Sequence, residues 1–283
     1  MSDATHLPAG ASLSSPDEAR PLIVKIGGTV AADTECTALL IEELTTLGRP
    51  TVLVHGGGKT VSSMSTTLGM EPEFRDGIRI TTPEEMEVVD MVLAGRVNTE
   101  LVRLAHRRAV PAVGLTGADG ELLVGRLLVP EDLTPSDTST RTARPHQVNP
   151  TVLRVVLAAG YLPIVATVGT GEDGYAVNIN ADEAAQAIAE RMPGATLCYL
   201  SDIPGVLNGD GSVIHTVPPE TVESLISSGI ARDGMAAKLR SCAAAVNAGV
   251  PEVMIGRYLQ QGDLRALVTG GVGTTIRTAH APD

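Results

Sequence analysis

The sequence predicts an α/β fold built on a mainly parallel sheet. Two short apolar runs, Leu22–Ile26 and Thr51–His55, have the length and composition of buried strands. Between them, residues 33–47 place leucines at helical spacing, and a second helical stretch follows at 60–68. Strand, helix, strand, helix at this spacing requires crossover connections, and crossovers join parallel strands.

Capping and stop signals place the other elements of the first half. The helix at 33–47 should end at Gly48, with Pro50 beyond it. Thr82, with Glu85 three residues on and Pro83 at the first helical position, should start a long helix. In chain order, we predict a mobile extension at 1–20, a polar loop at 72–82, the long helix at 83–108, a strand at 111–115 and a turn at 116–120.

The second half follows the same signals. Residues 130–150 are rich in Pro, Ser, Thr and Arg and predict an exposed loop or a hairpin insertion. The stretch 130–170 is the expected seam between two lobes of one continuous sheet. The further predictions are helices at 150–159, from 178 to about 191, at 219–227 and at 233–247, strands at 162–168, 195–200 and 251–256, and a segment at 270–276 that closes the fold.

Composition narrows the class of protein. The 283 residues include 43% hydrophobic but only 2% aromatic side chains, so the core must be aliphatic. A net charge of −12 argues against a general nucleic-acid surface, although a local pocket for a small anion remains open. No apolar run reaches the ~20 residues of a membrane helix, and residues 1–20 lack the pattern of a signal peptide. The three cysteines lack C-x-x-C spacing, and we expect a cytoplasmic protein.

The two glycine-rich loops after the first two strands carry the clearest chemical signal. Lys25 stands beside Gly27 and Gly28, and Lys59 directly follows Gly56–Gly58, although the chain has only three lysines among its 21 basic residues. Glycines let backbone N–H groups approach an anion, and the following helix points its positive end there. Neither loop fits the Walker or dinucleotide-binding pattern. Each alone is as well explained by a tight turn; two together favour a phosphoryl site.

Polar residues elsewhere add candidates, each with a structural alternative. Arg79 could clamp a carboxylate, although its spacing favours a solvated loop arginine. Asn178, Asn180 and Asp182 stand at a helix start, where one or more could serve only as caps. Asp202, before Pro204-Gly205, fits a nucleotide loop or a plain turn equally well. Lys238 lies one helical turn after Gly234 and is the third lysine.

Covalent catalysis has no candidate nucleophile in the sequence. The six histidines show no metal-ligand spacing, and His55 is better explained as a structural residue than as a base. A reaction that requires only positioning and charge stabilisation fits this inventory, and phosphoryl transfer is such a reaction.

These residues resemble the amino acid kinase family and, within it, the N-acetylglutamate kinases. The resemblance covers residues 22–276. The blocks that carry it lie at 24–28 (VKIGG), 54–58 (VHGGG), 76–81 (DGIRIT), 86–95 (MEVVDMVLAG), 113–117 (VGLTG), 160–163 (GYLP), 178–182 (NINAD), 200–207 (LSDIPGVL) and 234–238 (GMAAK).

The resemblance implies a three-layer αβα sandwich around an open sheet. It also implies transfer of the ATP γ-phosphoryl group, with Mg²⁺ carried by ATP, to the side-chain carboxylate of N-acetyl-L-glutamate, as in arginine synthesis. An amino-acid lobe at 21–170 would form the dimer, and residues 171–283 would bind ATP. A related acceptor, an N-blocked 2-aminoadipate, and a non-catalytic sensing role are the alternatives. The presence of Lys25, Asp182 and Lys238 together argues against the sensor.

The resemblance also implies a role for each site residue. Lys25 and Lys238 would stabilise the moving phosphoryl group, and Asp182 would hold both lysines. The residues implied for the acetylated amino acid and the phosphoryl cradle are Gly28, Gly57, Gly58, Arg79, Asn178 and Asn180. Those implied for the nucleotide are Gly27, Asp202, Ile203, Pro204, Gly205, Val206, Leu207, Ile230, Ala231 and Gly234. Lys59 is expected to be a surface residue at a helix start.

Three stretches depart from the family pattern. Residues 138–148 differ before Asn149-Pro150, so the substrate-side hairpin could differ in form. The N-terminal extension is a poor helix, and residues 265–269 lack an acidic residue expected in an arginine-sensing loop. We therefore expect a homodimer rather than a hexamer, without feedback inhibition by arginine.

Overall fold

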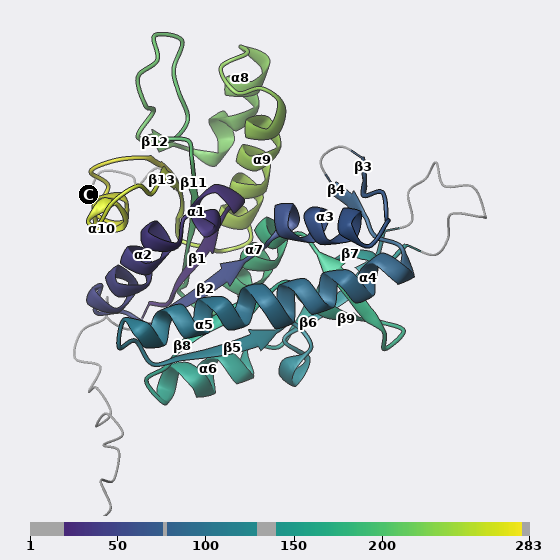
Figure 1. Ribbon diagram of the computed structural model, residues 1–283. Helices are drawn as coiled ribbons and strands as arrows, with labels where there is room; N and C mark the ends of the chain where they lie inside the picture. Colours follow the sequence, from purple (N-terminus) through teal and green to yellow (C-terminus); the bar gives the residue numbers. More distant parts are fainter. Residues whose placement is uncertain (1–19, 76–77, 129–139, 279–283) are drawn as a thin grey trace, which may run out of the picture.

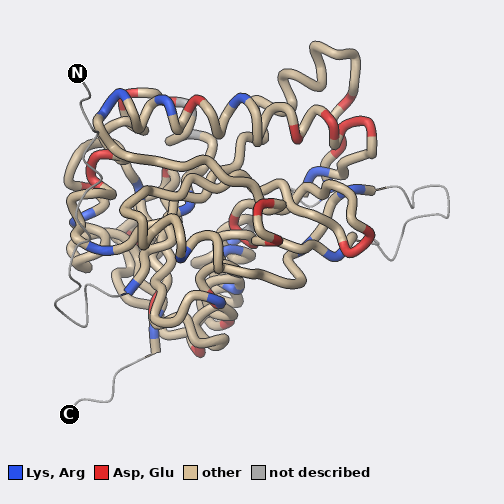
Figure 2. The backbone as a smooth tube through the Cα atoms, turned by 90° about the horizontal axis from the view of Figure 1, so that it is seen from below, with Lys and Arg blue, Asp and Glu red and all other residues tan. Residues whose placement is uncertain are grey.

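The computed structural model describes residues 20–75, 78–128 and 140–278 (Figure 1). Almost all of the expected N-terminal extension, the Asp76-Gly77 pair and most of the first half of the 130–150 insertion lie outside the described residues. Among the described residues, every helix is too short or too polar to cross a bilayer. Lys and Arg positions are scattered along the tube among Asp and Glu (Figure 2).

One large sheet runs through the described part of the chain. Its order is β12-β14-β13-β11-β1-β2-β8-β5, and adjacent strands are parallel except β13 and β14. The strands are β1 (Leu22–Ile26), β2 (Thr51–His55), β5 (Ala112–Thr116), β8 (Leu162–Ala166), β11 (Thr196–Ser201), β12 (Thr216–Val217), β13 (Val253–Arg257) and β14 (Thr274–Ile276). The predicted parallel sheet is confirmed, and β1 lies at its centre between β2 and β11.

Helices cover both faces of this sheet, which explains why its central strands are apolar on both sides (Figure 1). One face carries α2 (Thr34–Thr46), α5 (Asn98–Arg107) and α10 (Asp263–Val268). The other carries α6 (Thr151–Ala158), α7 (Ala181–Arg191), α8 (Val222–Ser227) and α9 (Asp233–Asn247). The three-layer αβα sandwich is therefore confirmed.

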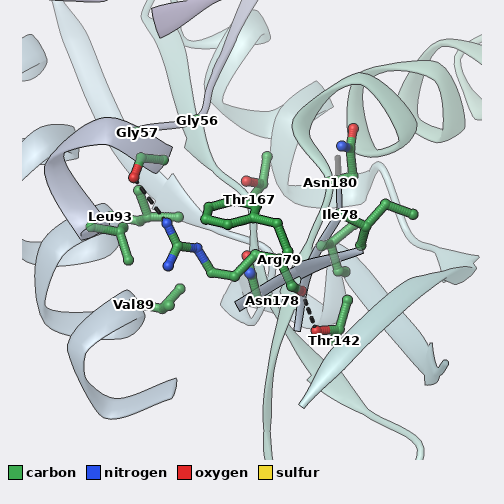
Figure 3. Close-up of a pocket in the computed structure, with 14 residues that line it drawn as sticks. Gly56, Gly57, Ile78, Arg79, Val89, Leu93, Thr142, Thr167, Asn178 and Asn180 are labelled. Atoms are coloured by element: carbon green, nitrogen blue, oxygen red, sulfur yellow. Dashed lines mark hydrogen bonds between the residues drawn. The ribbon is translucent and has the colours of Figure 1, made fainter. Parts of the chain in front are cut away.

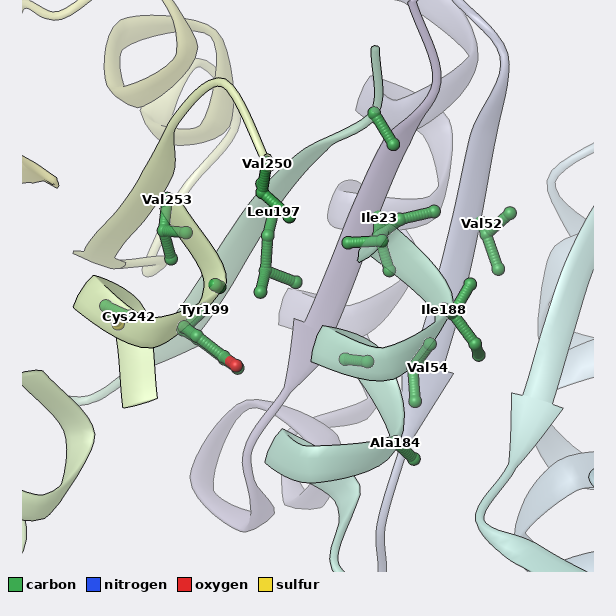
Figure 4. Packing of buried hydrophobic residues seen from close by; sticks show 14 of the residues in the cluster. Ile23, Val52, Val54, Ala184, Ile188, Leu197, Tyr199, Cys242, Val250 and Val253 are labelled. Carbon is green, nitrogen blue, oxygen red and sulfur yellow. The ribbon is translucent and has the colours of Figure 1, made fainter. Parts of the chain in front are cut away.

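Alternation along β1 divides its side chains between two aliphatic clusters. Val24 and its neighbours two positions away pack against α2, whereas Ile23 packs toward α7 (Figure 4). Lys25 has the parity of Ile23, so it points to the face that α7 and α9 cover. Lys25 therefore lies on the same face of the sheet as α7 and α9, which begin at the carboxyl edge of the sheet.

A small closed sheet adjoins the large one. Its order is β10-β7-β6-β9, with β6 (Leu123–Leu127), β7 (Thr142–Val148), β9 (Val168–Gly171) and β10 (Ala176–Ile179). In the described half of the 130–150 stretch, β7 pairs antiparallel with β6, so residues 142–148 form a strand and not a loop, whereas residues 129–139 lie outside the described residues. The strand predicted at 162–168 is confirmed as β8 but ends at Ala166. The chain leaves the large sheet at Thr167, and Val168 pairs instead with Asn178.

The segment predicted as a loop at 72–82 forms a short hairpin. Its strands are β3 (Glu73–Arg75) and β4 (Ile78–Ile80), three residues each, which is too short for an alternating pattern to stand out. Two further helices flank the glycine loops, α1 (Gly28–Ala32) and α3 (Gly58–Thr67). The sequence did not predict α1.

The long helix after Thr82 is confirmed but is not α-helical throughout. It consists of α4 (Pro83–Asp90), a π-helical segment (Met91–Val97) and α5. The Thr82 hydroxyl accepts a hydrogen bond from the Glu85 N–H, as predicted for the cap. The Glu85 carboxylate does not complete the capping box, because Arg79 binds it.

Candidate active site

The loops that follow β1, β2 and β11 meet at one edge of the sheet. These three strands are parallel neighbours, so their carboxyl ends lie side by side. The Gly27 N–H donates to the Leu200 carbonyl at 3.1 Å, which ties the first glycine loop to the end of β11. A Cβ at Gly56 would lie 3.4 Å from the Ala181 Cβ, so the second loop touches the start of α7.

Asp182 links the two lysines across this edge. Its Oδ1 lies 2.7 Å from the Lys25 Nζ and its Oδ2 lies 3.2 Å from the Lys238 Nζ. The side chains come from β1, α7 and α9 and are only 15%, 31% and 20% exposed for Lys25, Asp182 and Lys238. Burial alone would raise the pKa of Asp182, but the two ammonium groups outweigh it and lower that pKa. The carboxylate therefore stays ionised and holds both cations.

Asp182 is not needed as the N-cap of α7, because Asn180 caps that helix. The Asn180 side-chain oxygen accepts hydrogen bonds from the Asp182 and Glu183 N–H groups. Asn178 stands on β10, and its amide donates to the Thr81 hydroxyl at 2.9 Å. The cap-only interpretation therefore describes Asn180, whereas Asn178 and Asp182 have other partners.

The helices after the glycine loops begin without a side-chain cap. Gly27 precedes α1 and Gly57 precedes α3, whereas Asp33, Thr82 and Asn180 cap their helices through side chains. The first N–H groups of a helix have no acceptor within the helix. Gly28 and Gly58 occupy those first positions. Their N–H groups are therefore suited to an anion brought by a ligand.

Gly57 lies close against the long helix, and its backbone is extended with a φ of 168°. A Cβ at this position would lie 2.7 Å from Cδ2 of Leu93, which belongs to the π-helical segment. A larger residue here would therefore require the Leu93 side chain to shift. The approach brings the second loop against one wall of a cavity.

A cavity of about 160 Å³ opens beside the second glycine loop (Figure 3). Apolar side chains from α3, the β3–β4 hairpin and the long helix form part of its wall, and polar groups from β7 and β10 form the rest. The lining residues are Gly56, Gly57, Gly58, Val61, Phe74, Ile78, Arg79, Val89, Leu93, Thr142, Thr167, Asn178, Ile179 and Asn180.

Arg79 is the charged residue that lines this cavity. Contrary to the solvated arginine that spacing favoured, its side chain is only 7% exposed. It donates to the Glu85 carboxylate at 2.6 Å, to the Gly58 carbonyl at 3.0 Å and to the Ser62 hydroxyl, and the Phe74 ring centroid lies 4.7 Å from its Cζ. Its Nε and one Nη1 hydrogen bind no other described residue. The guanidinium is thus fixed, with donors left for a ligand.

Apart from Gly27 in the first glycine loop, the residues implied for the nucleotide follow β11 or lie near the start of α9. Asp202 is exposed just after β11, and Gly234 is exposed in the first turn of α9. Gly205 has a φ of +146°, and a Cβ there would lie 2.7 Å from the Thr274 hydroxyl, so the turn requires glycine. The Val206 N–H donates to that hydroxyl at 2.8 Å. Ile203, Pro204 and Ile230 are half-buried, Ala231 is buried and Leu207 is exposed.

Sequence reasoning missed a buried pair behind the second glycine loop. His55 is fully buried, and its Nδ1 lies 2.9 Å from the Gly56 carbonyl, so Nδ1 must carry the hydrogen. The Asn98 amide donates to its Nε2 at 3.0 Å and to the carbonyls of β5 and β8. Burial lowers the pKa of His55 to about 4, so the ring is neutral. The sequence signal that could have identified this pair is Asn98, an asparagine among the apolar, buried positions of the long helix.

One further expectation concerns Lys59. Lys59 is exposed at the second position of α3, as predicted for a surface residue. Within the described ranges, there is no group of three or more His, Cys, Asp or Glu side chains arranged to hold a metal ion.

Comparison with known proteins gives consistent matches. A family model described as the amino acid kinase family matches residues 20–257. The acetylglutamate kinase of Parvibaculum lavamentivorans is 35% identical over 269 residues, covering 91% of this chain and 88% of that protein. The solved structure of smu.665 from Streptococcus mutans UA159 has a TM-score of 0.73 at 25% identity, covering 92% of this chain and 99% of that one. Carbamate kinase from Giardia lamblia bound to AMP-PNP shares the fold, with a TM-score of 0.65 at 16% identity, covering 92% and 99%.

Proposed function

Because the chain belongs to the amino acid kinase family, we propose that it transfers the γ-phosphoryl group of ATP to the side-chain carboxylate of N-acetyl-L-glutamate. The product would be N-acetyl-L-glutamyl 5-phosphate, an intermediate of arginine biosynthesis. Similarity to acetylglutamate kinases favours this acceptor over a longer aminoadipate chain. The observation that carries the proposal is Asp182 bridging Lys25 and Lys238 beside two uncapped glycine loops.

The chemistry needs no general base, and none stands among the candidate residues. A carboxylate acceptor is already ionised at neutral pH, so it can attack phosphorus without giving up a proton. Negative charge spreads over the transferring group in the transition state, and fixed cations and N–H donors stabilise it. Lys25 and Lys238 supply the cations, and the N–H groups of Gly28 and Gly58 supply the donors. The Asp182 carboxylate offsets the repulsion between the two ammonium groups.

The cavity beside Gly57 would hold the acetylated amino acid. The Nε–H or the remaining Nη1–H of Arg79 would donate a charge-assisted hydrogen bond to the α-carboxylate. Asn178 and the glycine loop supply polar groups on the opposite wall, with Asn180 close by. The side-chain carboxylate of the substrate would then point toward the two lysines.

ATP would bind along residues 202–207 and the start of α9, on the side of Lys25, Asp182 and Lys238 that faces away from the cavity. The first turn of α9 lacks a side-chain cap, so its N–H groups suit phosphate oxygens. Magnesium would be carried by the ATP phosphates, whose charge it offsets, because the described residues do not group into a metal site of their own.

Two further proposals concern the oligomeric state and the cellular location of the enzyme. We propose a homodimer formed through the N-terminal lobe at 21–170, with the ATP lobe at 171–283. We also propose that it works in the cytoplasm. Sedimentation of the purified protein would test the first, because a monomer would exclude the dimer.

The test is an acyl-phosphate trap. Purified protein with MgATP, hydroxylamine and N-acetyl-L-glutamate should yield the hydroxamate of the acetylated amino acid, with ADP formed in equal amount. N-acetyl-2-aminoadipate in the same assay measures chain-length preference. Lys59→Met should keep the wild-type rate, whereas Lys238→Met should abolish it. Absence of hydroxamate with both acids would refute the kinase assignment, and a faster reaction with the longer acid would refute the named acceptor.

A further inference from the structure

The tyrosine at the centre of the Lys25–Asp182–Lys238 trio has no role in the chemistry described so far. Tyr199 belongs to β11 and is only 1% exposed. In the parallel ladder its register partner on β1 is Lys25, so the two side chains point to the same face of the sheet. Tyr199 lies beside Cys242 of α9 in the core beneath that face (Figure 4).

Tyr199 also contacts the other two members of the trio. Its hydroxyl donates to the main-chain carbonyl of Asp182 at 3.1 Å, in the first turn of α7. The Lys238 Nζ lies 5.1 Å from the centroid of its ring. An ammonium within about 6 Å of an aromatic centroid is attracted by the ring, more strongly when it is shielded from water. Burial raises the pKa of Tyr199, so the phenol keeps the proton that it donates.

We propose that Tyr199 is a positioning residue for the phosphoryl-transfer reaction, holding Lys238 on its ring and fixing the helix turn that carries Asp182. Lysine needs such support because its long stem has many rotamers and its charge is a single point. The Asp182 carboxylate binds the Lys238 ammonium through an ion pair, and the face of the Tyr199 ring attracts the same ammonium from another direction. This inference rests on the proposed function, because its kinetic consequence appears only if the chain is a kinase.

The alternative is that Tyr199 only fills the core. Tyr258 provides a matched control, since it is also 1% exposed and its hydroxyl donates to a buried carboxylate, that of Glu43. Tyr258 packs in the other cluster, with α2 and α10, away from both lysines. Loss of either tyrosine should therefore lower the melting temperature, but only one should alter turnover.

The kinetic test compares three variants at saturating MgATP and acetylglutamate. Tyr199→Leu removes the ring and should lower kcat roughly tenfold, as expected for a shielded cation–π contact, while KM for acetylglutamate changes by less than about twofold. Tyr199→Phe keeps the ring and should retain at least a third of the wild-type kcat. Tyr258→Leu should keep the wild-type kcat below its melting temperature. Wild-type turnover in Tyr199→Leu, or equal losses in the Phe and Leu variants, would overturn the role of the ring.

A second readout requires no activity. Because the chain has three lysines, ¹³Cε-lysine labelling gives only the signals of Lys25, Lys59 and Lys238, and Lys238→Arg identifies the last. The Lys238 ε-protons should be shifted upfield by the ring in the wild type and in Tyr199→Phe. They should return to the position of the exposed Lys59 in Tyr199→Leu. An unshifted wild-type signal would refute the contact even in an active kinase, whereas a shifted signal in an inactive protein would refute only the proposed function.

Discussion

Replacing Asp182 by asparagine tests the central claim about the site with the smallest change of shape. Each carboxylate oxygen of Asp182 faces a different ammonium, Oδ1 toward Lys25 and Oδ2 toward Lys238. An amide has one oxygen and one NH₂ group. Whichever way the new amide side chain turns, one lysine faces a donor instead of an acceptor, and the two cations lose the charge between them. We expect the lysines to move apart.

The magnitude follows from the partial burial of the trio. Exposed ion pairs contribute up to about 1 kcal/mol each, and breaking a fully buried pair costs about 3–5 kcal/mol. The Asp182 side chain is 31% exposed and lies between these cases. We therefore expect a loss of roughly 2 kcal/mol in the free energy of unfolding, or about 4–8 °C in Tm. Loss of aligned transition-state charges should lower kcat by about 100- to 1000-fold.

The assay is hydroxamate formation at saturating substrates, below the Tm of every variant, with Tm measured by calorimetry. Asp173→Asn is the matched control, because Asp173 pairs with Arg141 at 2.7 Å on the β9–β10 turn, outside the cavity lining. The control should keep its kcat and lose only stability. If Asp182→Asn turned over at the wild-type rate, Asp182 would not orient the lysines.

Three further sets of substitutions separate the other roles. Lys25→Arg and Lys238→Arg should each lower kcat far more than they raise KM, because a planar guanidinium cannot replace a point charge with three rotatable donors. Arg79→Lys should raise KM for acetylglutamate about ten- to a hundredfold with a smaller change in kcat, because a flexible ammonium cannot keep the contact with Glu85 and also hold a fixed donor toward the α-carboxylate. His55→Gln should flatten the pH dependence of the unfolding free energy between about pH 7.5 and 5, measured by urea titration.

Each of these predictions has a contrary result. Unchanged kcat in both lysine variants would remove the transition-state role, with Lys59→Arg as the charge-matched control. A loss of kcat alone in Arg79→Lys would contradict carboxylate binding. The sign for His55 follows from its depressed pKa, about 4 in the fold against 6.5 ordinarily. Its stabilising effect is complete above about pH 6.5 and falls toward pH 4, by about 2 kcal/mol at pH 5. Equal pH slopes in wild type and His55→Gln would refute the buried neutral ring.

The sequence predicted best where periodicity and caps agree over several turns. Residues 233–247 match α9, and Thr51–His55 matches β2 at both ends. Gly48 and Gly160 end their segments with positive φ, as their positions after apolar stripes indicated. The trio was placed by resemblance, since Lys25, Asp182 and Lys238 are far apart in the chain and meet only through the order of strands.

Elements set by tertiary contact escaped prediction. The helix α1 begins beside two glycines, which have poor helix propensity, so its local sequence gives no helical signal. Spacing made Arg79 look solvated, because its burial depends on Glu85 in another element. The change to π-helix at Met91–Val97 has no periodic signature either, although it sets Leu93 against Gly57.

The position of β1 affects how the chain can be synthesised without aggregating. Among the strands that the structure describes, β1 comes first in the chain, yet one of its two ladders is completed only by β11, from the second half of the chain. Until β11 emerges from the ribosome, β1 presents an unpaired edge of apolar residues, the kind of edge that pairs with other chains. Lys25 is the one charged residue on that strand. The lysine proposed to face ATP in the finished enzyme thus also interrupts the apolar run of this strand during synthesis.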